Sequence, residues 1–257
     1  MKAVLEPVTK PATPDYVLSV FVDWHRQQCE GLGDPEADPD IKLTFDSTVK
    51  DWRMASDLLP WRQLAHAMNG FWHIERSDKE WKKVLEPAKA HRLREVCDLI
   101  AQTARMEAVM PSGFLGATCK SAGAFRSVRS KLAAAGADVS QLWPSTPLEP
   151  YMRKYFDVFL NEILAMAPGS LPVIKPHKPL YYWSSCSAGL CLLATLVAYL
   201  FGAIGIAVIS FALFLVSQAM IWITAKSLPA RVELGELKTF RDLAQAIAIH
   251  HSANLTN

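Results

Sequence analysis

The chain has 257 residues and a nearly balanced charge, with 27 Lys and Arg residues against 25 Asp and Glu residues. This balance implies no basic face, and no stripe of interleaved basic and aromatic residues is present, so the sequence argues against nucleic-acid binding. The apolar fraction of 51% argues against an intrinsically disordered chain.

The first predicted helix follows a short leader, residues 1–14, whose prolines prevent helix formation. We expect this helix from Tyr16 to Cys29, capped by Asp15, because its apolar residues form one broad face. Gly31–Gly33 predicts where it ends. Residues 34–40 form an acidic, turn-rich loop that lacks the ligand order of a calcium-binding loop, so we expect no metal there.

The rest of the first predicted domain, residues 15–104, contains a short extended piece and three more helices. The extended piece is Ile41–Phe45. The helices are Leu58–Asn69, capped by Ser56 or Asp57 and ended by Gly70; Asp78–Leu85, after the capping box that begins at Ser77; and His91–Ala104.

Two stretches of this domain, Leu64-Ala-His-Ala-Met-Asn-Gly-Phe-Trp-His-Ile-Glu75 and Leu93-Arg-Glu-Val-Cys-Asp-Leu-Ile100, resemble the second half of an acyl carrier protein. The resemblance implies a small four-helix bundle whose signature is Asp-Ser-Leu, with a phosphopantetheine arm on the serine near a helix N-terminus. Here the matching place has Ser56-Asp57-Leu58, in which the two polar residues are reversed, and Asp46-Ser47-Thr48 lies earlier in the chain. Ser47 and Ser56 are therefore the candidates for modification, but the resemblance fails at the residue that carries the chemistry.

A second helical domain is expected after a linker over residues 105–121. Its helices are predicted at Ala122–Ala135 and Pro147–Ala165, the latter after a capping box that begins at Thr146. Leu237–Ile247 repeats the spacing of Leu93–Gln102. We therefore predict a second carrier-like unit, residues 122–178 plus 226–250, that is split by an insertion; the alternative is that amphipathic helices of similar length look alike.

The insertion is the segment from Pro179 to Ala225, which contains no Asp, Glu, Lys or Arg. A membrane span needs about 20 apolar residues, so this segment has room for two helices, Trp183–Phe201 and Ile204–Ile223, joined by a tight turn at Gly202–Gly205. Uncharged polar residues in the spans fit helix-to-helix hydrogen bonding: Ser184, Ser187, Thr195, Ser210, Ser217 and Gln218. Gly189 and Gly202 are expected to allow close backbone approach.

Basic residues flank this hairpin, whereas its turn has no charge. They are Arg153, Lys154, Lys175 and Lys178 before it and Lys226 and Arg231 after it. By the positive-inside rule we expect a multi-pass protein of the cell inner membrane with both termini cytoplasmic.

Few residues suggest chemistry. The five cysteines are scattered without metal-ligand spacing, which favours reduced thiols over a zinc site. His66 and His91 are isolated on helices, and the His250-His251 pair lies near a polar end of the chain. No phosphate-binding, dinucleotide, metalloprotease or nucleophile-elbow motif occurs. We expect no catalytic residue, metal or cofactor.

The sequence therefore predicts an all-α protein with small helical bundles of acyl-carrier-like type and a two-helix transmembrane hairpin. Its expected partners are the lipid bilayer and another protein at the cytoplasmic face. The predicted function is that of a membrane-anchored, non-catalytic interaction or scaffold protein. Two alternatives stay open: a working acyl or peptidyl carrier, and a subunit of a membrane transport or secretion assembly.

Overall fold

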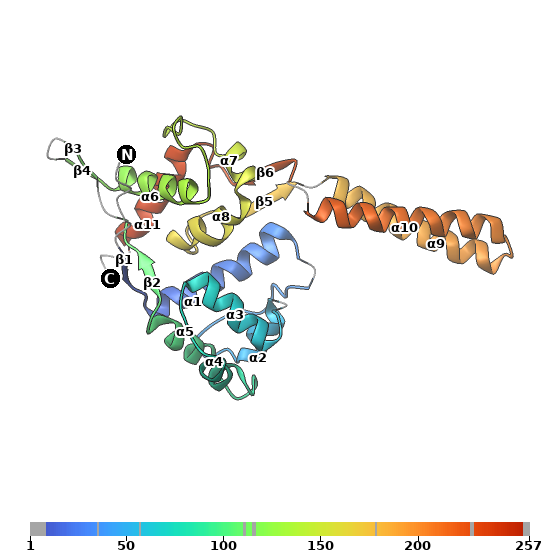
Figure 1. The fold of residues 1–257 in the computed structure, drawn as a ribbon, viewed down its shortest axis with the longest axis horizontal. Helices are drawn as coiled ribbons and strands as arrows, with labels where there is room; N and C mark the ends of the chain where they lie inside the picture. Colours follow the sequence, from blue (N-terminus) through green and yellow to red (C-terminus); the bar gives the residue numbers. More distant parts are fainter. Residues whose placement is uncertain are drawn as a thin grey trace. The chain divides into compact units, whose positions relative to one another are not determined.

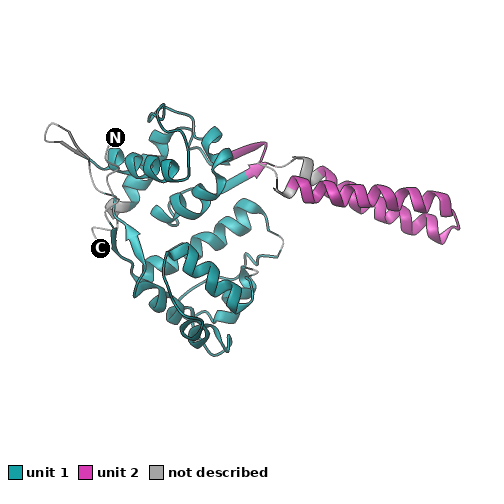
Figure 2. Ribbon diagram, in the orientation of Figure 1, with its two compact units in different colours: residues 1–175, 233–257 teal, residues 176–232 magenta. Residues whose placement is uncertain are grey.

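The protein is mainly helical and divides into two compact units (Figures 1 and 2). The computed structural model describes residues 9–34, 36–56, 58–109, 112–114, 117–177, 179–226 and 229–253. Unit 1 comprises residues 1–175 and 233–257, and unit 2 comprises residues 176–232. The chain thus leaves unit 1, forms unit 2 and returns to unit 1 for its last helix.

The first half of unit 1 is built from five α-helices, one of which continues as a π-helix. They are α1 (Pro14–Arg26), continued by η1 (Gln27–Leu32); α2 (Val49–Ala55); α3 (Trp61–Trp72); α4 (Asp78–Leu85); and α5 (Leu93–Ala101). Their apolar faces enclose one core, in which Val17, Trp81 and Ile100 are fully buried. Two strands pair antiparallel: β1 (Thr9–Pro11), which precedes α1, and β2 (Arg105–Glu107), which follows α5.

Local chemistry explains where these helices begin and end. The α4 helix has the predicted bounds because Ser77 and Glu80 form the expected capping box. The cap of α1 is Thr13, not Asp15, which lies in the first turn. Gly33 ends η1 with φ 63°, a left-handed conformation that glycine adopts without strain.

Other predicted features of this half differ in the structure. Ile41–Phe45, predicted as a short extended piece, lies in no strand, and Thr48 caps the α2 helix shortly after it. The α3 helix begins after Pro60, because a residue that precedes proline is disfavoured in the helical conformation. It also continues past Gly70 and ends at His73, which has φ 50°. Asp57 and residues 1–8 of the predicted leader lie outside the described residues.

The second half of unit 1 follows a segment that contains β3 (Ser112–Phe114) and β4 (Ala117–Cys119), which pair antiparallel. Its helices are α6 (Lys120–Ala134), α7 (Glu149–Lys154), α8 (Phe156–Val158), η2 (Phe159–Ile163), η3 (Leu164–Met166) and α11 (Phe240–Ala253). The single helix predicted over Pro147–Ala165 is thus broken, since Tyr155 has φ −117° and ψ 42°. Thr146 makes no capping box, because its hydroxyl accepts from the N–H of Trp143 instead.

The two halves of unit 1, which we call the first copy and the second copy, share a hydrogen-bond pattern. In the first copy, the N–H of Leu93 donates to the carbonyl of Ser47 at 2.9 Å, and the N–H of Val49 donates to the carbonyl of His91 at 3.0 Å. The Ser47 hydroxyl also accepts from the N–H of Thr44 at 2.9 Å. These bonds join the turn before α2 to the residues that precede α5.

The second copy repeats each of these bonds at the same relative positions. The N–H of Phe240 donates to the carbonyl of Thr146 at 3.2 Å, and the N–H of Leu148 donates to the carbonyl of Lys238 at 2.9 Å. The Thr146 hydroxyl accepts from the N–H of Trp143 at 2.9 Å. The turn before α7 is therefore joined to the start of α11 as the turn before α2 is joined to the start of α5.

This correspondence pairs Leu93 with Phe240, whereas the sequence spacing paired it with Leu237, about one helical turn earlier. Both residues are buried: Leu93 is 0% and Phe240 is 1% exposed. The ring of Phe240 lies 6.4 Å from that of Phe125 on α6 and 6.5 Å from that of Phe159. The predicted packing of the last helix against these residues is therefore present. The division of unit 1 into two carrier-like domains stays a prediction.

Unit 2 is dominated by two antiparallel helices, α9 (Pro179–Leu200) and α10 (Ile204–Lys226), that lie side by side (Figure 1). Gly202 turns the chain between them with φ 74°. The segments Trp183–Leu200 and Ile204–Thr224 are long and apolar enough to cross a membrane. Two strands flank the helices, β5 (Ile174–His177) and β6 (Arg231–Leu234), and they pair with each other.

The two long helices meet through small and hydroxyl side chains. The hydroxyl groups of Ser187 and Ser217 lie 3.0 Å apart, as predicted for a helix-to-helix hydrogen bond. Close approach was expected at Ser187-Ala-Gly189 and at Gly202. Ala188 is 4% exposed and lies at the contact, whereas a Cβ added at Gly189 or at Gly202 would meet no atom within 4 Å, so neither glycine is needed for it. The large apolar side chains point outward and are exposed, including Leu190, Leu193, Leu196, Ile206, Ile209 and Leu213.

Candidate functional site

Three cavities of unit 1 adjoin one another along the junction of its two halves. Their volumes are about 350, 540 and 300 Å³. The first and second share Phe71 and Glu162, the second and third share Trp24 and Met68, and Asn161 lines all three. We call this series of cavities the seam groove. It runs between α1 and α3 on one side and η2 on the other.

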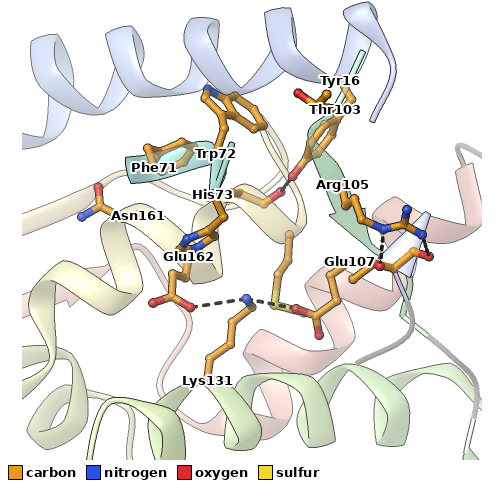
Figure 3. A pocket seen from close by; sticks show the side chains of 13 residues that line it. Tyr16, Phe71, Trp72, His73, Thr103, Arg105, Glu107, Lys131, Asn161 and Glu162 are labelled. Atoms are coloured by element: carbon orange, nitrogen blue, oxygen red, sulfur yellow. Dashed lines mark hydrogen bonds and ion pairs between the residues drawn. The ribbon is translucent and has the colours of Figure 1, made fainter. Parts of the chain in front are cut away.

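One end of the seam groove is charged (Figure 3). The ammonium of Lys131, on α6, lies 3.0 Å from the carboxylate of Glu107 and 3.4 Å from that of Glu162. Glu107 is the last residue of β2 and Glu162 belongs to η2, so Lys131 on α6 joins three elements. The side chain of Glu107 is only 11% exposed, which makes its pairing with Lys131 important for stability.

Aromatic side chains form the wall beside this charged end. The ring centroid of Trp72 lies 6.0 Å from that of Tyr16 and 5.0 Å from that of Phe71, and both pairs are edge-to-face. The Tyr16 hydroxyl donates to the carbonyl of Ala165 at 2.9 Å. Burial, together with the charge of Glu107, raises the pKa of Tyr16 to about 12. Tyr16 therefore stays a neutral hydrogen-bond donor.

One polar atom of this wall lacks a partner. The indole Nε1 of Trp72 is buried and makes no hydrogen bond to any described residue, although Trp72 lines the charged end of the groove. Leaving a buried donor unpaired costs about 1–3 kcal/mol.

The other end of the seam groove is mostly apolar. Phe21 and Trp52 stack there with ring centroids 4.7 Å apart, and further apolar side chains complete the lining: Trp24, Leu32, Leu58, Met68 and Leu160. Gln28 and Asp34 supply polar groups at this end, and they are hydrogen-bonded to each other at 2.7 Å. The groove therefore combines an apolar end with a charged end.

The two serines proposed from the sequence lie in different surroundings. Ser56 lines the apolar end but is only 6% exposed, and its hydroxyl lies 3.3 Å from Nδ1 of His25. Ser47 belongs to the turn before α2, where its hydroxyl accepts from Thr44. The structure does not bring the two serines together at one site.

The thiol of Cys29 also lies near His25, the residue that contacts Ser56. The sulfur of Cys29 lies 3.7 Å from Nδ1 of His25, which is also the arrangement of a cysteine nucleophile and its base. Burial raises the pKa of Cys29, and the charges of Asp34, Asp38 and Glu30 raise it further. These carboxylates oppose thiolate formation, so this pair lacks the activation that nucleophilic catalysis needs.

The histidines singled out in the sequence make ordinary local contacts. His91 lies 2.8 Å from the carboxylate of Glu95, one turn further along the chain. His250 lies against the hydroxyl of Ser170, and burial lowers its pKa. Among the residues whose positions are described, no three His, Cys, Asp or Glu side chains are grouped as metal ligands.

The groove itself was not apparent in the sequence. Phe71 and Trp72 were noted only within the stretch that resembles an acyl carrier protein, and neither Lys131 nor Asn161 was singled out. The lining residues come from distant segments, so no spacing could indicate them. Comparison with known proteins adds no relative: no protein family matches the chain, and no curated protein or solved structure is significantly similar to it.

Proposed function

We propose that the chain is a membrane-anchored, non-catalytic binding protein, and that the seam groove holds an extended segment of a partner protein. The observation that carries this proposal is the lining of the groove, in which Glu107, Lys131 and Glu162 form a charged end and apolar side chains form the other end. A peptide supplies polar backbone groups together with apolar side chains, so it suits both ends of the groove.

The outward faces of α9 and α10 support membrane anchoring. A helical pair buried in a soluble protein covers its large apolar side chains, whereas here Leu193, Leu196 and Ile209 are more than half exposed. Trp183 and Trp222 lie near the ends of the two helices that adjoin the flanking strands, where indole rings suit a membrane interface.

The basic flanks support the proposed orientation. We place the hairpin in the cell inner membrane with both termini cytoplasmic, because the Lys and Arg residues lie before and after the hairpin and none lies in its turn. Unit 1 contains chain from both sides of the hairpin. This agrees with an even number of spans.

Gly70 offers a direct test, because it lines the middle of the groove and a Cβ added there would meet no atom within 4 Å. Gly70→Leu should fill the groove without disturbing the fold, and leucine also has the higher helix propensity, by about 1 kcal/mol. Gly70→Ala is the matched control, since it adds helix propensity but little volume.

The measurement is site-specific photo-crosslinking in native membranes. A photoreactive residue at Ala67, which also lines the groove, should give one defined protein adduct, and the same residue at Trp143, on the surface outside the groove, should not. Gly70→Leu should abolish the adduct and Gly70→Ala should keep it. An adduct that persists in Gly70→Leu at native yield would rule out the groove as the binding site.

The second candidate function is handling of an acyl chain, favoured by the apolar end of the groove, where Phe21, Leu58 and Leu160 lie. An acyl chain, however, offers no polar group to the charged end of the groove, where Lys131 lies. Intact mass of the protein after co-expression with a phosphopantetheinyl transferase distinguishes the two functions. Addition of one phosphopantetheine at Ser47 would establish the carrier function, and an unchanged mass together with the groove adduct would support partner binding.

A further inference from the structure

A fourth cavity of unit 1 lies between α6 and α11 and has a volume of about 550 Å³. It shares no lining residue with the seam groove. Three arginines line it, Arg126 and Arg129 from α6 and Arg241 from α11, and no lining residue is acidic. We call it the arginine cavity.

The three guanidinium groups make no hydrogen bond or ion pair within the described residues. The charge of Arg241 acts on the Asp242 carboxylate, but the pKa of Asp242 is lowered chiefly by the backbone N–H of Thr239, and Arg241 makes a smaller contribution. Asp242 accepts from Thr239 and Lys238 at the start of α11, so it serves the helix cap. The positive charge of the cavity is therefore not neutralised by a facing acid.

The first copy shows what the same framework looks like without such a cavity. The N–H of Arg94 donates to the carbonyl of Phe45, as the N–H of Arg241 donates to that of Pro144, so the two arginines correspond. The Arg94 guanidinium lies over the Phe45 ring, 4.1 Å from its centroid. Proline offers no such ring to Arg241.

The residue one turn further along differs as well. Asp98 follows Arg94 on α5, whereas Gln245 occupies the corresponding place after Arg241 on α11 and lines the arginine cavity. The second copy thus lacks both the ring that covers the arginine and the acid one turn after it. Its cavity is lined by three guanidinium groups that make no ion pair with a described residue.

The rim of the arginine cavity also contains donors that stabilise negative charge. The thiol of Cys119 lines the cavity, and the hydroxyl of Ser121 and the N–H of Ala122 lower its pKa by hydrogen-bonding to the thiolate. Donors that stabilise a thiolate also suit other anions.

We propose that the arginine cavity binds a phosphate group. Guanidinium groups form paired, charge-assisted hydrogen bonds with phosphate oxygens, and three of them around one cavity match a tetrahedral dianion better than a planar carboxylate. The phosphate can belong to a small soluble molecule or to the headgroup of an anionic lipid. Both sources present the same chemistry to Arg126, Arg129 and Arg241.

Calorimetric titration of the full-length protein in a neutral detergent tests the proposal. One arm uses phenyl phosphate as the soluble probe, and the other uses short-chain phosphatidic acid mixed into the micelles. Saturable binding in either arm supports the site, and the arm with the tighter binding identifies the source. Absence of saturable binding in both arms up to millimolar probe would overturn the proposal.

The variants assign any binding to the cavity. Arg126→Gln and Arg241→Gln change exposed side chains, and each should weaken binding at least about tenfold, since a charge-assisted hydrogen bond contributes about that factor. Gln245→Glu introduces an acid at the position that corresponds to Asp98. It leaves all three arginines in place and should weaken binding by a similar factor. Arg153→Gln, on the surface of α7, is the control and should bind as the native protein does. If all four variants bind the probe as tightly as the native protein does, the probe binds outside the arginine cavity.

Discussion

The two copies within unit 1 share a hydrogen-bonded framework, but they differ in the segment that connects its first helix to its last helix. In the first copy, α3 and α4 connect α2 to α5, and the chain never leaves the unit. In the second copy, the chain from α7 to α11 passes through η2 and then through the whole α9–α10 hairpin. The last helix, α11, is therefore held by its own packing and hydrogen bonds, because no short connection restrains it.

The strongest test of this comparison removes the anchor of each last helix. Phe240→Ala and Leu93→Ala truncate corresponding residues that are 1% and 0% exposed. The phenylalanine variant should lower the free energy of unfolding by about 3–5 kcal/mol and the leucine variant by about 2–5 kcal/mol. Thermal unfolding of the full-length protein in detergent measures both effects.

The two variants also distinguish a docked α11 from a loosely attached one. If α11 belongs to the fold, Phe240→Ala lowers the unfolding temperature of the whole of unit 1, and a disulfide crosslink forms between cysteines introduced at positions 125 and 240. A near-native unfolding temperature and no crosslink would show that α11 is peripheral, whatever the outcome for Leu93→Ala.

A second, smaller effect concerns the cation that links the halves. Lys131→Met leaves the mostly buried carboxylate of Glu107 without its partner, and we expect a loss of about 1–3 kcal/mol in the free energy of unfolding. Glu162→Gln is the matched change at the exposed partner of the same lysine and should cost less than about 1 kcal/mol. Denaturant titration compares the two, and equal losses would contradict the assigned difference in burial.

How much of this architecture is apparent in the sequence depends on the range of the interactions. The hairpin was predictable because Pro179–Ala225 has a composition that few other structures explain, and α4 because its cap is local. The α2 helix was missed although Thr48 and Asp51 form a capping box, since the segment is short and its apolar pattern alternates. Local signals thus predicted helices best where they were long or cleanly capped.

Longer-range features were not predictable in the same way. The register between the copies is set by backbone hydrogen bonds such as that from Phe240 to Thr146, which no side-chain spacing specifies, so the sequence repeat was aligned one turn too early. The break at Tyr155 depends on backbone dihedral angles rather than on a breaker residue there. The seam groove needs residues from α1, α3 and η2 to meet, and only the folded chain brings them together.

The smallest predicted effect is the pH dependence of two helix caps, that of α5 in the first copy and that of α11 in the second. The N–H and hydroxyl of Thr239 hold the pKa of Asp242 below its ordinary value. Partial burial raises the pKa of Glu95, but hydrogen bonds from the Arg92 N–H and from His91 outweigh it, so this pKa is also lowered. A carboxyl with a lowered pKa in the folded state stabilises the protein above its ordinary pKa, and the stabilisation is lost as the pH falls through the folded value.

Both caps should therefore weaken below about pH 4, where carboxyl groups in the unfolded chain begin to bind protons. Asp242→Asn and Glu95→Gln each remove one contribution, and each should reduce the loss of stability between pH 6 and pH 3 by roughly 0.3–1 kcal/mol, the range for an exposed charge at a helix N-terminus. The pKa of Glu80 is lowered to about 2 in the native protein, and its contribution cancels because both variants retain it. Unfolding measured at several pH values in low salt tests this, and identical pH profiles for the native protein and Asp242→Asn would show that the cap of α11 owes nothing to its charge.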